Sequence, residues 1–332
     1  MGKRQKIGGL WDDPERLERY QKLFAKAFPG QTALDILHRR GNFFFDKENS
    51  NKLINVIYLF IQSINCLEFL KMKSTLIMMD IKTNGHLRDE FTGSIFRGWL
   101  GFILKCNPGK PCNGCSETNS CPYFMVFKEK TDIKPYSILS FKSGDLIRNF
   151  IKIYGDRKKY APKILSDIKD KASSKHFGGL KYSIESLEAK NIEIPNIKLS
   201  SSTIVAFVSP VHLLRNRRTE VIPSFSSLLA SSVRSYNRIT KYYDPDVYPY
   251  KISEELLNAE VPILDFDVKT MKHIHTTMED RSISLEGSTG WIKFDTSSVP
   301  SKAGEVLKIG EALQIGKHTT YGFGGFMLNT EA

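Results

Sequence analysis

The chain has 332 residues, of which 48 are Lys or Arg and 36 are Asp or Glu, so its formal net charge is +12 at pH 7. Hydrophobic residues make up 41% of the sequence, enough to fill folded cores, which excludes wholesale disorder. No apolar run approaches the roughly 18 residues that a membrane-spanning helix needs, and five cysteines in a chain of this length do not indicate a secreted disulfide scaffold. The composition predicts a soluble, cytoplasmic protein that binds a polyanion.

The first 70 residues differ from the rest of the chain. Apolar residues recur there at three- and four-residue spacing, as on one face of a helix: Leu17, Tyr20, Phe24 and Phe28. Further helical stretches are predicted over residues 32–40 and 52–70, with a strand over 56–60 as the competing interpretation. Residues 1–70 are therefore predicted to form a small helical N-terminal extension.

From residue 71 onward, strand and helix patterns alternate. Residues 76–81 form a short apolar run that predicts a central strand. Residues 92–105 place apolar side chains at helical spacing and Arg97 on the polar side, which predicts an amphipathic helix. A helix over 156–172 and an alternating strand over 180–187 follow.

The second half repeats this plan after a polar segment over residues 191–202, which is the predicted linker. The predicted elements are a strand at 203–208, a helix at 223–241, strands near 261–268, 282–286 and 289–294 with a turn at 286–290, and a turn-rich segment at 310–328. Each half thus has a strand, a helix, further strands and a glycine-rich segment. This order predicts two α+β domains of similar topology, residues 71–195 and 200–330, each a helix-backed antiparallel sheet.

Four cysteines lie in one loop rich in proline and glycine, with the spacing C-x5-C-x2-C-x5-C: Cys106, Cys112, Cys115 and Cys121. Four thiolates that converge in one loop can bind a tetrahedral Zn²⁺, and the metal would order a segment with little apolar content. We predict a structural zinc ion in this loop, residues 106–122; the alternatives are a loop without metal or one closed by a disulfide. Cys66 stands apart and is predicted to be a buried apolar residue.

Glycines are frequent within residues 310–326, and they allow tight turns and close approach of the backbone to a ligand. The centre of this run holds Lys317, His318, Thr319 and Thr320, where backbone N–H groups and side chains could meet a phosphate. The run lacks the G-x4-G-K-[ST] pattern that leads into a helix, so it is not a nucleotide-binding P-loop.

Basic residues cluster between residues 142 and 181 and again between 215 and 241. In the second segment, Glu220 is the single acidic residue. The basic residues there are Arg215, Arg217, Arg218, Arg234, Arg238 and Lys241. Tyrosines close to it could stack on unpaired bases. Arginines interspersed with aromatic residues favour RNA as the polyanion. The seven histidines are scattered singly and match no metalloprotease or serine-hydrolase motif.

Three segments resemble the CRISPR-associated RAMP proteins and, among these, the repeat-processing endoribonucleases. Residues 92–101 are similar to the G-x-x-x-R-G-x-x-G first helix of that family, and residues 121–127 to the loop that follows it. Residues 310–326 resemble its C-terminal glycine-rich signature, including the Gly-Lys-x-Thr-Thr-x-Gly-x-Gly core. Ser209-Pro210-Val211 is also similar. The motifs occur in the family's order, and the resemblance covers roughly residues 72–330.

This resemblance implies an α+β fold of tandem ferredoxin-like (RRM-like) domains with a glycine-rich C-terminal loop. It also implies metal-independent cleavage of CRISPR repeat RNA (pre-crRNA), in which the 2′-hydroxyl attacks the adjacent phosphate and leaves a 2′,3′-cyclic phosphate and a 5′-hydroxyl. The residues predicted to bind RNA are Arg97, Arg215, Arg217, Arg218, Arg234, Arg238, Gly316, Thr319, Thr320, Gly322 and Gly324.

Such a reaction needs a general base, a general acid and a cation beside the phosphate. The family commonly carries a histidine in or beside its first helix, whereas residues 92–105 contain none. His86, just upstream, is the nearest substitute, and His318 lies within the glycine-rich run. The predicted catalytic residues are therefore His86, His318 and Lys317, with His273 and His275 as the next candidates.

Two other functions are compatible with the same residues. The chain could be an RNA-binding subunit of a CRISPR effector complex that does not cleave. It could instead be an interaction module whose residues 1–70 dock another CRISPR-associated protein.

Overall fold

The computed structural model describes residues 72–330, apart from residues 90, 107–111, 113–114, 129–130, 193, 195–196 and 277–281. The predicted helical extension over residues 1–70, with Cys66, lies outside the described residues. Among the described helices, none combines the length and apolar character needed to cross a bilayer.

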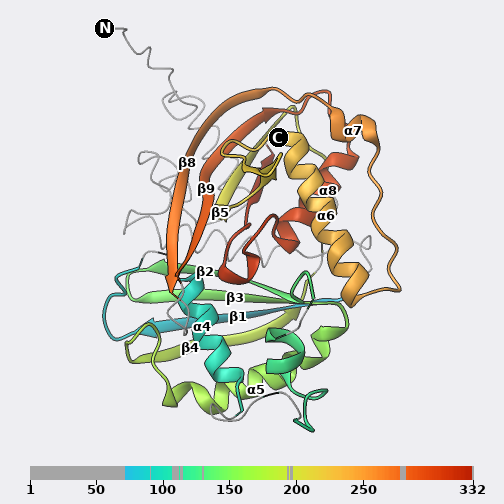
Figure 1. Ribbon diagram of the computed structural model, residues 1–332. Coiled ribbons are helices and arrows are strands. Elements are labelled where there is room, and N and C mark those ends of the chain that lie inside the picture. Colours follow the sequence, from blue (N-terminus) through green and yellow to red (C-terminus); the bar gives the residue numbers. More distant parts are fainter. Residues whose placement is uncertain are drawn as a thin grey trace, which may run out of the picture. The chain divides into compact units, whose positions relative to one another are not determined.

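The first half of the described chain, residues 72–192, has the element order βαββαβ (Figure 1). Its strands and long helices are β1 (Ser74–Thr83), α4 (Gly93–Leu104), β2 (Tyr136–Ser143), β3 (Leu146–Tyr154), α5 (Ala161–Lys171) and β4 (Tyr182–Asn191). The antiparallel sheet has the order β2-β3-β1-β4. Short helical turns cover Tyr123–Phe127, Gly155–Tyr160 and Ala172–Ser174.

The apolar pattern of the sequence explains this half. Alternate residues of β1, such as Ile77, Met79 and Ile81, point into one buried core together with the apolar face of α4. Phe96 and Ile103 on that face are completely buried. The predicted strand at 76–81 and the predicted amphipathic helix at 92–105 are therefore both present.

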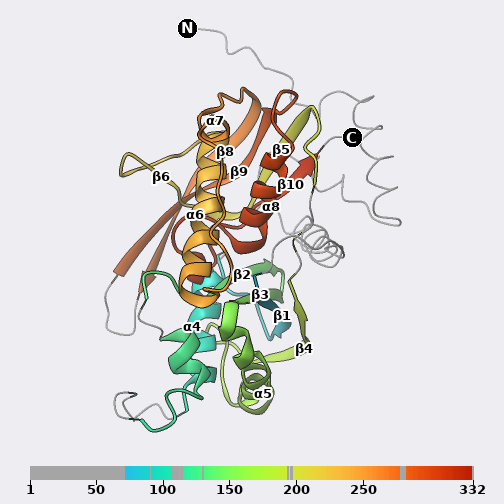
Figure 2. The same cartoon turned by 90° about the vertical axis from the view of Figure 1, so that its right-hand side faces the viewer.

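The second half, residues 197–330, has the same core order with added short elements (Figures 1 and 2). Its elements are β5 (Ser202–Val211), the hairpin β6 (Leu214–Arg215) and β7 (Arg218–Thr219), α6 (Phe225–Tyr243), α7 (Glu254–Asn258), β8 (Ile263–Thr276), β9 (Ser282–Asp295), α8 (Lys302–Leu313), a 3₁₀ turn (Thr319–Tyr321) and β10 (Met327–Thr330). The sheet order β10-β5-β9-β8 is the counterpart of the first. The predicted fold, two tandem ferredoxin-like units, is confirmed.

Two sequence predictions in this half were wrong. The expected turn at 286–290 lies inside β9, where all five residues pair with β8. Its glycines serve close packing: a Cβ on Gly290, whose φ is +112°, would lie 1.8 Å from the Asp267 carbonyl oxygen. Residues 310–313, expected in turns, complete α8, because an apolar face containing Val306, Leu307 and Ile309 is fully buried.

A third apolar cluster joins the two halves. It contains Tyr154 from β3, Tyr236 and Tyr243 from α6, and Leu313 from the end of α8. Polar contacts reinforce it, since the Tyr154 hydroxyl donates to the Leu313 carbonyl oxygen at 2.9 Å. The end of α8, from which the glycine-rich segment continues, is therefore held against the first sheet.

Candidate functional site

The glycine-rich loop, residues 314–326, connects α8 to the edge strand β10 and packs against the start of α4. Gly93, the first residue of α4, has no room for a side chain, because a Cβ there would lie 2.2 Å from the Tyr321 carbonyl oxygen. Gly322 has a φ of +96°, and its Cβ position would lie 3.1 Å from the Cα of Gly93. Two motifs that are far apart in the sequence thus form one surface.

The end of β5 holds the loop from its other side. The Gly325 amide donates to the Ser209 Oγ at 2.9 Å, and the Gly324 amide donates to the Pro210 carbonyl oxygen at 2.8 Å. The Lys317 amide donates to the His212 carbonyl oxygen at 3.0 Å. The Ser209-Pro210-Val211 motif therefore anchors the loop and brings His212 beside it.

Buried Gln314 fixes the first residue of the loop. Its side-chain amide donates to the carbonyl oxygens of Ile138 at 2.9 Å and Phe323 at 2.7 Å, and its side-chain oxygen accepts from the Ser137 hydroxyl at 2.6 Å. All polar atoms of this side chain are used in structure, so Gln314 positions the loop against β2.

Four histidines gather around the loop, and we call them the histidine cluster: His212, His273, His275 and His318. The His212 and His318 rings lie 5.3 Å apart between centroids. The Tyr321 ring centroid lies 6.4 Å from that of His318 and 5.0 Å from that of His275.

The far end of β8, whose sequence includes His273 and His275, lies near α4 (Figure 1). His273 Nε2 is 2.9 Å from the Ser94 Oγ in the first turn of α4, and the His273 ring contacts Phe91 edge-on. His275 lies two residues further along the same face of the strand. No histidine lies on α4 itself, but His273 of β8 thus lies beside its first turn.

Burial of the histidine cluster disfavours the protonated, positively charged forms of its imidazoles. Desolvation, reinforced by His212 and Lys317, lowers the pKa of His318 to about 4. Desolvation likewise lowers the pKa values of His212, His273 and His275, with Lys317 adding to the effect at His212 and Arg97 at His275. At neutral pH the imidazoles are uncharged and can accept protons. A bound phosphate would favour their protonated forms.

Arg97, predicted to bind RNA, is already held by aromatic rings. Its guanidinium lies 4.2 Å from the ring centroid of Tyr321 and 5.1 Å from that of Phe127. The Arg97 Nε is buried without a hydrogen-bond partner. This fixed positive charge lies over the Tyr321 ring and close enough to His275 to lower the pKa of that histidine.

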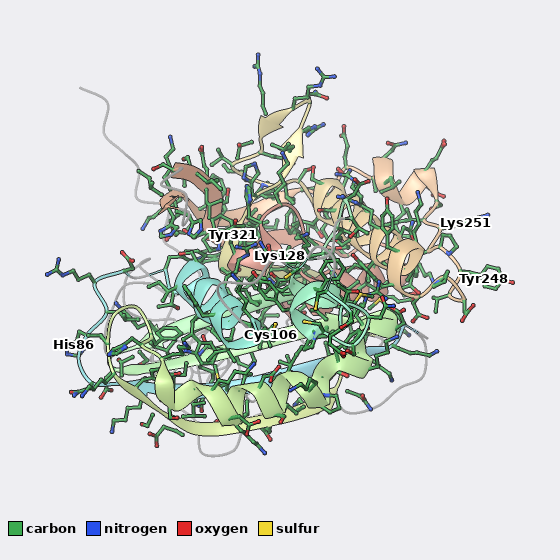
Figure 3. The ribbon with its side chains drawn as sticks, turned by 60° about the horizontal axis from the view of Figure 1, so that its bottom comes forward. His86, Cys106, Lys128, Tyr248, Lys251 and Tyr321 are labelled. Carbon is green, nitrogen blue, oxygen red and sulfur yellow. The ribbon has the colours of Figure 1, made fainter. Side chains whose placement is uncertain are left out.

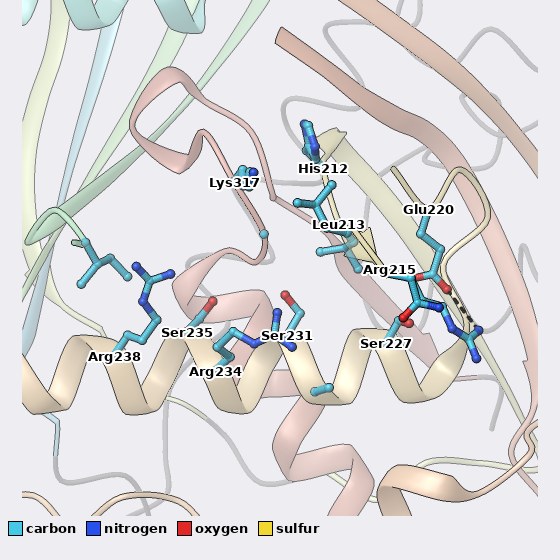
Figure 4. Close-up of a pocket in the computed structure, with 15 residues that line it drawn as sticks. His212, Leu213, Arg215, Glu220, Ser227, Ser231, Arg234, Ser235, Arg238 and Lys317 are labelled. Atoms are coloured by element: carbon cyan, nitrogen blue, oxygen red, sulfur yellow. Dashed lines mark ion pairs between the residues drawn. The ribbon is translucent and has the colours of Figure 1, made fainter. Parts of the chain in front are cut away.

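A basic pocket of about 350 Å³ adjoins the loop on its α6 side (Figure 4). Its positively charged lining residues are Arg215, Arg234, Arg238 and Lys317, joined by His212, Gly316 and Glu220. Arg234 and Arg238 lie one turn apart on α6 and point to the same side. The structure brings these predicted RNA-binding residues together.

The other predicted RNA-binding residues lie around these two features. Arg217 and Arg218 are exposed on the β6–β7 hairpin, and Arg217 has a φ of +64° in its turn. Thr319 and Thr320 are half-buried in the 3₁₀ turn of the loop. Gly324, with a φ of +84°, is buried, since its Cβ position would lie 2.1 Å from the Ile315 carbonyl oxygen.

His86 is placed differently from the other predicted catalytic residues. It is exposed in the turn after β1, and Figure 3 shows it well apart from Tyr321. The adjoining Asn84 amide donates to the Lys181 carbonyl oxygen, which ties the turn to the start of β4. The structure therefore brings together His318 and Lys317, but not His86.

The structure does not support the predicted zinc site. Within the described part of the chain, no group of three or more His, Cys, Asp or Glu side chains is placed to share a metal ion. Cys106, Cys112, Cys115 and Cys121 are free thiols. Cys106 is exposed after α4, whereas Cys112 and Cys121 pack on the first core. Two of the thiols thus serve as apolar packing groups.

Comparison with known proteins gives two family matches. Residues 205–326 match the model of the CRISPR-associated endoribonuclease Cas6, and residues 69–182 match a family described as an N-terminal domain. No curated protein sequence matches the chain closely enough to count as a relative.

Solved structures share the fold at low sequence identity. Thermus thermophilus Cas6 (TTHB231) is 13% identical with a TM-score of 0.52, and the match covers 79% of this chain and 100% of that one. The Cas6 (TTHB231) product complex is 13% identical with a TM-score of 0.53, covering 77% and 99%. The Cas6 (TTHA0078) product complex is 12% identical with a TM-score of 0.51, covering 78% and 100%.

Proposed function

We propose that this chain, which belongs to the family of CRISPR-associated Cas6 endoribonucleases, cleaves CRISPR repeat RNA without a metal ion at the surface shared by α4 and the glycine-rich loop. One observation carries the proposal. The histidine cluster, Tyr321 and Arg97 converge where the two family motifs meet, directly beside a pocket lined by arginines and lysine.

The chemistry needs two proton transfers and one stabilised charge. The 2′-oxygen forms a bond to the adjacent phosphorus while the bond from phosphorus to the 5′-oxygen breaks. One neutral histidine takes the 2′-hydroxyl proton, and a second group gives a proton to the 5′-oxygen. The products are a 2′,3′-cyclic phosphate and a 5′-hydroxyl, and no other reactant is needed.

His275 and His318 are the pair we assign to these transfers, because both rings contact Tyr321, with centroids 5.0 and 6.4 Å from its own. Burial keeps both neutral in the free protein, which suits a base. Negative charge at the scissile phosphate would raise the pKa of one of them into the range of a useful acid. Arg97 and Lys317 would balance the charge that develops on the phosphate.

The proposed partners are repeat RNA and other CRISPR-associated proteins. One of the matched structures is named as a product complex of Cas6, and another match lies within a Cas6-RT-Cas1--Cas2 complex. The net charge of +12 supports RNA as the partner of this chain.

The test is single-turnover cleavage of the host's own repeat RNA in EDTA, followed by analysis of the product ends. We expect one cut per repeat at an undiminished rate, with a cyclic phosphate on the upstream fragment. Loss of cleavage in EDTA, restored by a divalent ion, would contradict a metal-independent reaction.

A matched RNA with a 2′-deoxy nucleotide upstream of the cut is the control, since it removes the nucleophile and should remain intact. If the unmodified repeat binds tightly but is never cut, the chain is instead an RNA-binding subunit of an effector complex.

A further inference from the structure

The basic pocket contains one acidic group that phosphate binding does not require. Glu220 follows the β6–β7 hairpin and lies among the arginines of the pocket lining. A carboxylate inside a pocket built for phosphates weakens the attraction for an anion. Its presence therefore points to a ligand that offers hydrogen-bond donors as well as negative charge.

The environment of Glu220 leaves one carboxylate oxygen unused. The Oε1 atom accepts a hydrogen bond from the Ser224 amide at 3.1 Å, immediately before α6. The Oε2 atom is buried and has no hydrogen-bond partner, and the side chain is only 10% exposed. Arg215 Nη1 forms a long ion pair with Oε1, at 3.9 Å (Figure 4). An unpaired buried carboxylate oxygen is costly unless a ligand supplies a donor.

The two ends of the pocket differ in chemistry (Figure 4). Glu220 and Ser227 lie toward the start of α6, whereas Arg234 and Arg238 lie further along the helix and Lys317 faces them from the loop. Seven residues separate Ser227 from Arg234, a distance of about 10 Å along the helix axis. The pocket thus has an acceptor end and a phosphate end.

Arg234 is available for a ligand. It is exposed and makes no hydrogen bond or ion pair with other described residues, while Arg238 uses one guanidinium N–H on the Asp132 carbonyl oxygen at 3.0 Å. The volume of about 350 Å³ is within the range of pockets that hold small molecules.

We propose that this pocket binds one unpaired guanosine nucleotide of the RNA, with its phosphate on Arg234 and Lys317 and its base edge on Glu220. A carboxylate only accepts hydrogen bonds, and guanine presents two adjacent donors, N1–H and the 2-amino group. Adenine and cytosine place an acceptor next to their amino group, and uracil flanks its single N–H with two carbonyl oxygens. Glu220 therefore selects guanine.

The inference rests on the proposed RNA substrate, but its test is independent of cleavage. Binding of GMP, IMP, AMP, CMP and UMP to the full chain would be measured by titration calorimetry, with inorganic phosphate as the reference anion. IMP lacks only the 2-amino group, so it tests the base edge without any mutation. We expect GMP to bind about tenfold or more tightly than IMP and UMP, the range of a bidentate contact.

Two variants separate the ends of the pocket. Glu220→Gln keeps an acceptor for the Ser224 amide but loses the second acceptor oxygen, so the preference for GMP over IMP should disappear. Arg234→Ala should weaken all nucleotides alike. Glu255→Gln, an exposed change on α7, is the matched control and should leave every affinity unchanged.

Replacing each unpaired guanosine of a non-cleavable repeat by inosine then identifies the RNA nucleotide. Inosine at one position of the RNA should weaken its binding to the wild-type chain but not to the Glu220→Gln variant. Equal binding of GMP, IMP and UMP would overturn the proposal, as would inorganic phosphate binding as tightly as GMP. A repeat that binds equally with inosine at every position would overturn the assignment to RNA, whether or not the chain cleaves.

Discussion

Gly93→Ala is the substitution that most directly perturbs the contact between α4 and the glycine-rich loop. The new Cβ would lie 2.2 Å from the Tyr321 carbonyl oxygen, although real Cβ atoms essentially never come closer than 3.0 Å to a neighbour. The helix and the loop must therefore separate by about 0.8 Å or more. Overpacking of this kind costs about 1–3 kcal/mol of folding free energy.

The larger effect should be on the reaction. A displacement approaching 1 Å can cost about 10²-fold in rate, and the Tyr321 ring contacts both His275 and His318. We expect single-turnover cleavage by Gly93→Ala to slow about 100-fold, while binding of repeat RNA changes less than threefold, on the order of 0.6 kcal/mol.

The matched control lies on the same helix. A Cβ on Gly98 meets no atom within 4 Å, so Gly98→Ala should leave the rate unchanged and raise the free energy of unfolding by about 0.5–1 kcal/mol. If Gly93→Ala folds and cleaves at the wild-type rate, the contact does not position the reacting groups.

Three further outcomes follow from charge and burial. Glu311→Ala should lower the free energy of unfolding by about 3–5 kcal/mol in urea titrations, because it removes the buried 2.9 Å ion pair with Lys308 and the attraction of the carboxylate for buried Lys152. Lys302→Ala, which breaks the more exposed pair with Glu305, should cost less than about 1 kcal/mol. The logarithm of the RNA association constant should fall steeply and linearly with the logarithm of the salt concentration. Arg234→Ala should reduce the magnitude of that slope by about one, because one phosphate contact is lost; an unchanged slope would exclude a phosphate contact at Arg234. The pKa of His318 is about 4 in the folded protein and 6.5 ordinarily, so between these pH values the unfolded chain binds more protons than the folded chain. The free energy of unfolding should therefore decrease as pH falls from 6.5 toward 4. This decrease should be smaller in the His318→Gln variant.

The sequence predicted those parts of the fold that local patterns determine. The apolar spacing of residues 92–105 specifies a helix that buries one face, and the continuous apolar run at 76–81 specifies a strand that is buried on both faces. The repeated order of elements indicated the tandem architecture. The wrong turn at 286–290 shows the limit of such reasoning. Its glycines serve contact with Asp267 and with the β5 end, and this contact is visible only in three dimensions.

The candidate site was only partly predictable for the same reason. His318, Lys317 and the arginines of α6 could be named from motif and charge clustering. His275 could be named only as a reserve candidate, because its approach to Tyr321 depends on the length of the β8–β9 pairing. Tyr321, His212 and Ser94 were missed as site residues. The one signal for His212 and Tyr321 was their position beside the Ser209-Pro210-Val211 motif and within the glycine-rich run.

The zinc site predicted from the cysteine spacing is not supported by the described part of the structure, and the reason is also three-dimensional. A loop of four thiols permits zinc binding, but the spacing does not say whether the side chains converge. Cys112 and Cys121 instead cover the apolar residues of the first core. A metal assay of the purified chain would measure this directly.

The central claim is that the histidine cluster around Tyr321 performs the cleavage. Single-turnover rates of His275→Ala, His318→Ala and His86→Ala on the repeat RNA test it most directly. Removal of a general acid or base typically costs about 10²–10⁴ in rate, so His275→Ala and His318→Ala should each slow cleavage by that factor with RNA affinity nearly intact. His86→Ala, an exposed change away from the loop, should cleave at nearly the wild-type rate. Wild-type rates for both cluster variants, with slow cleavage by His86→Ala, would contradict the account.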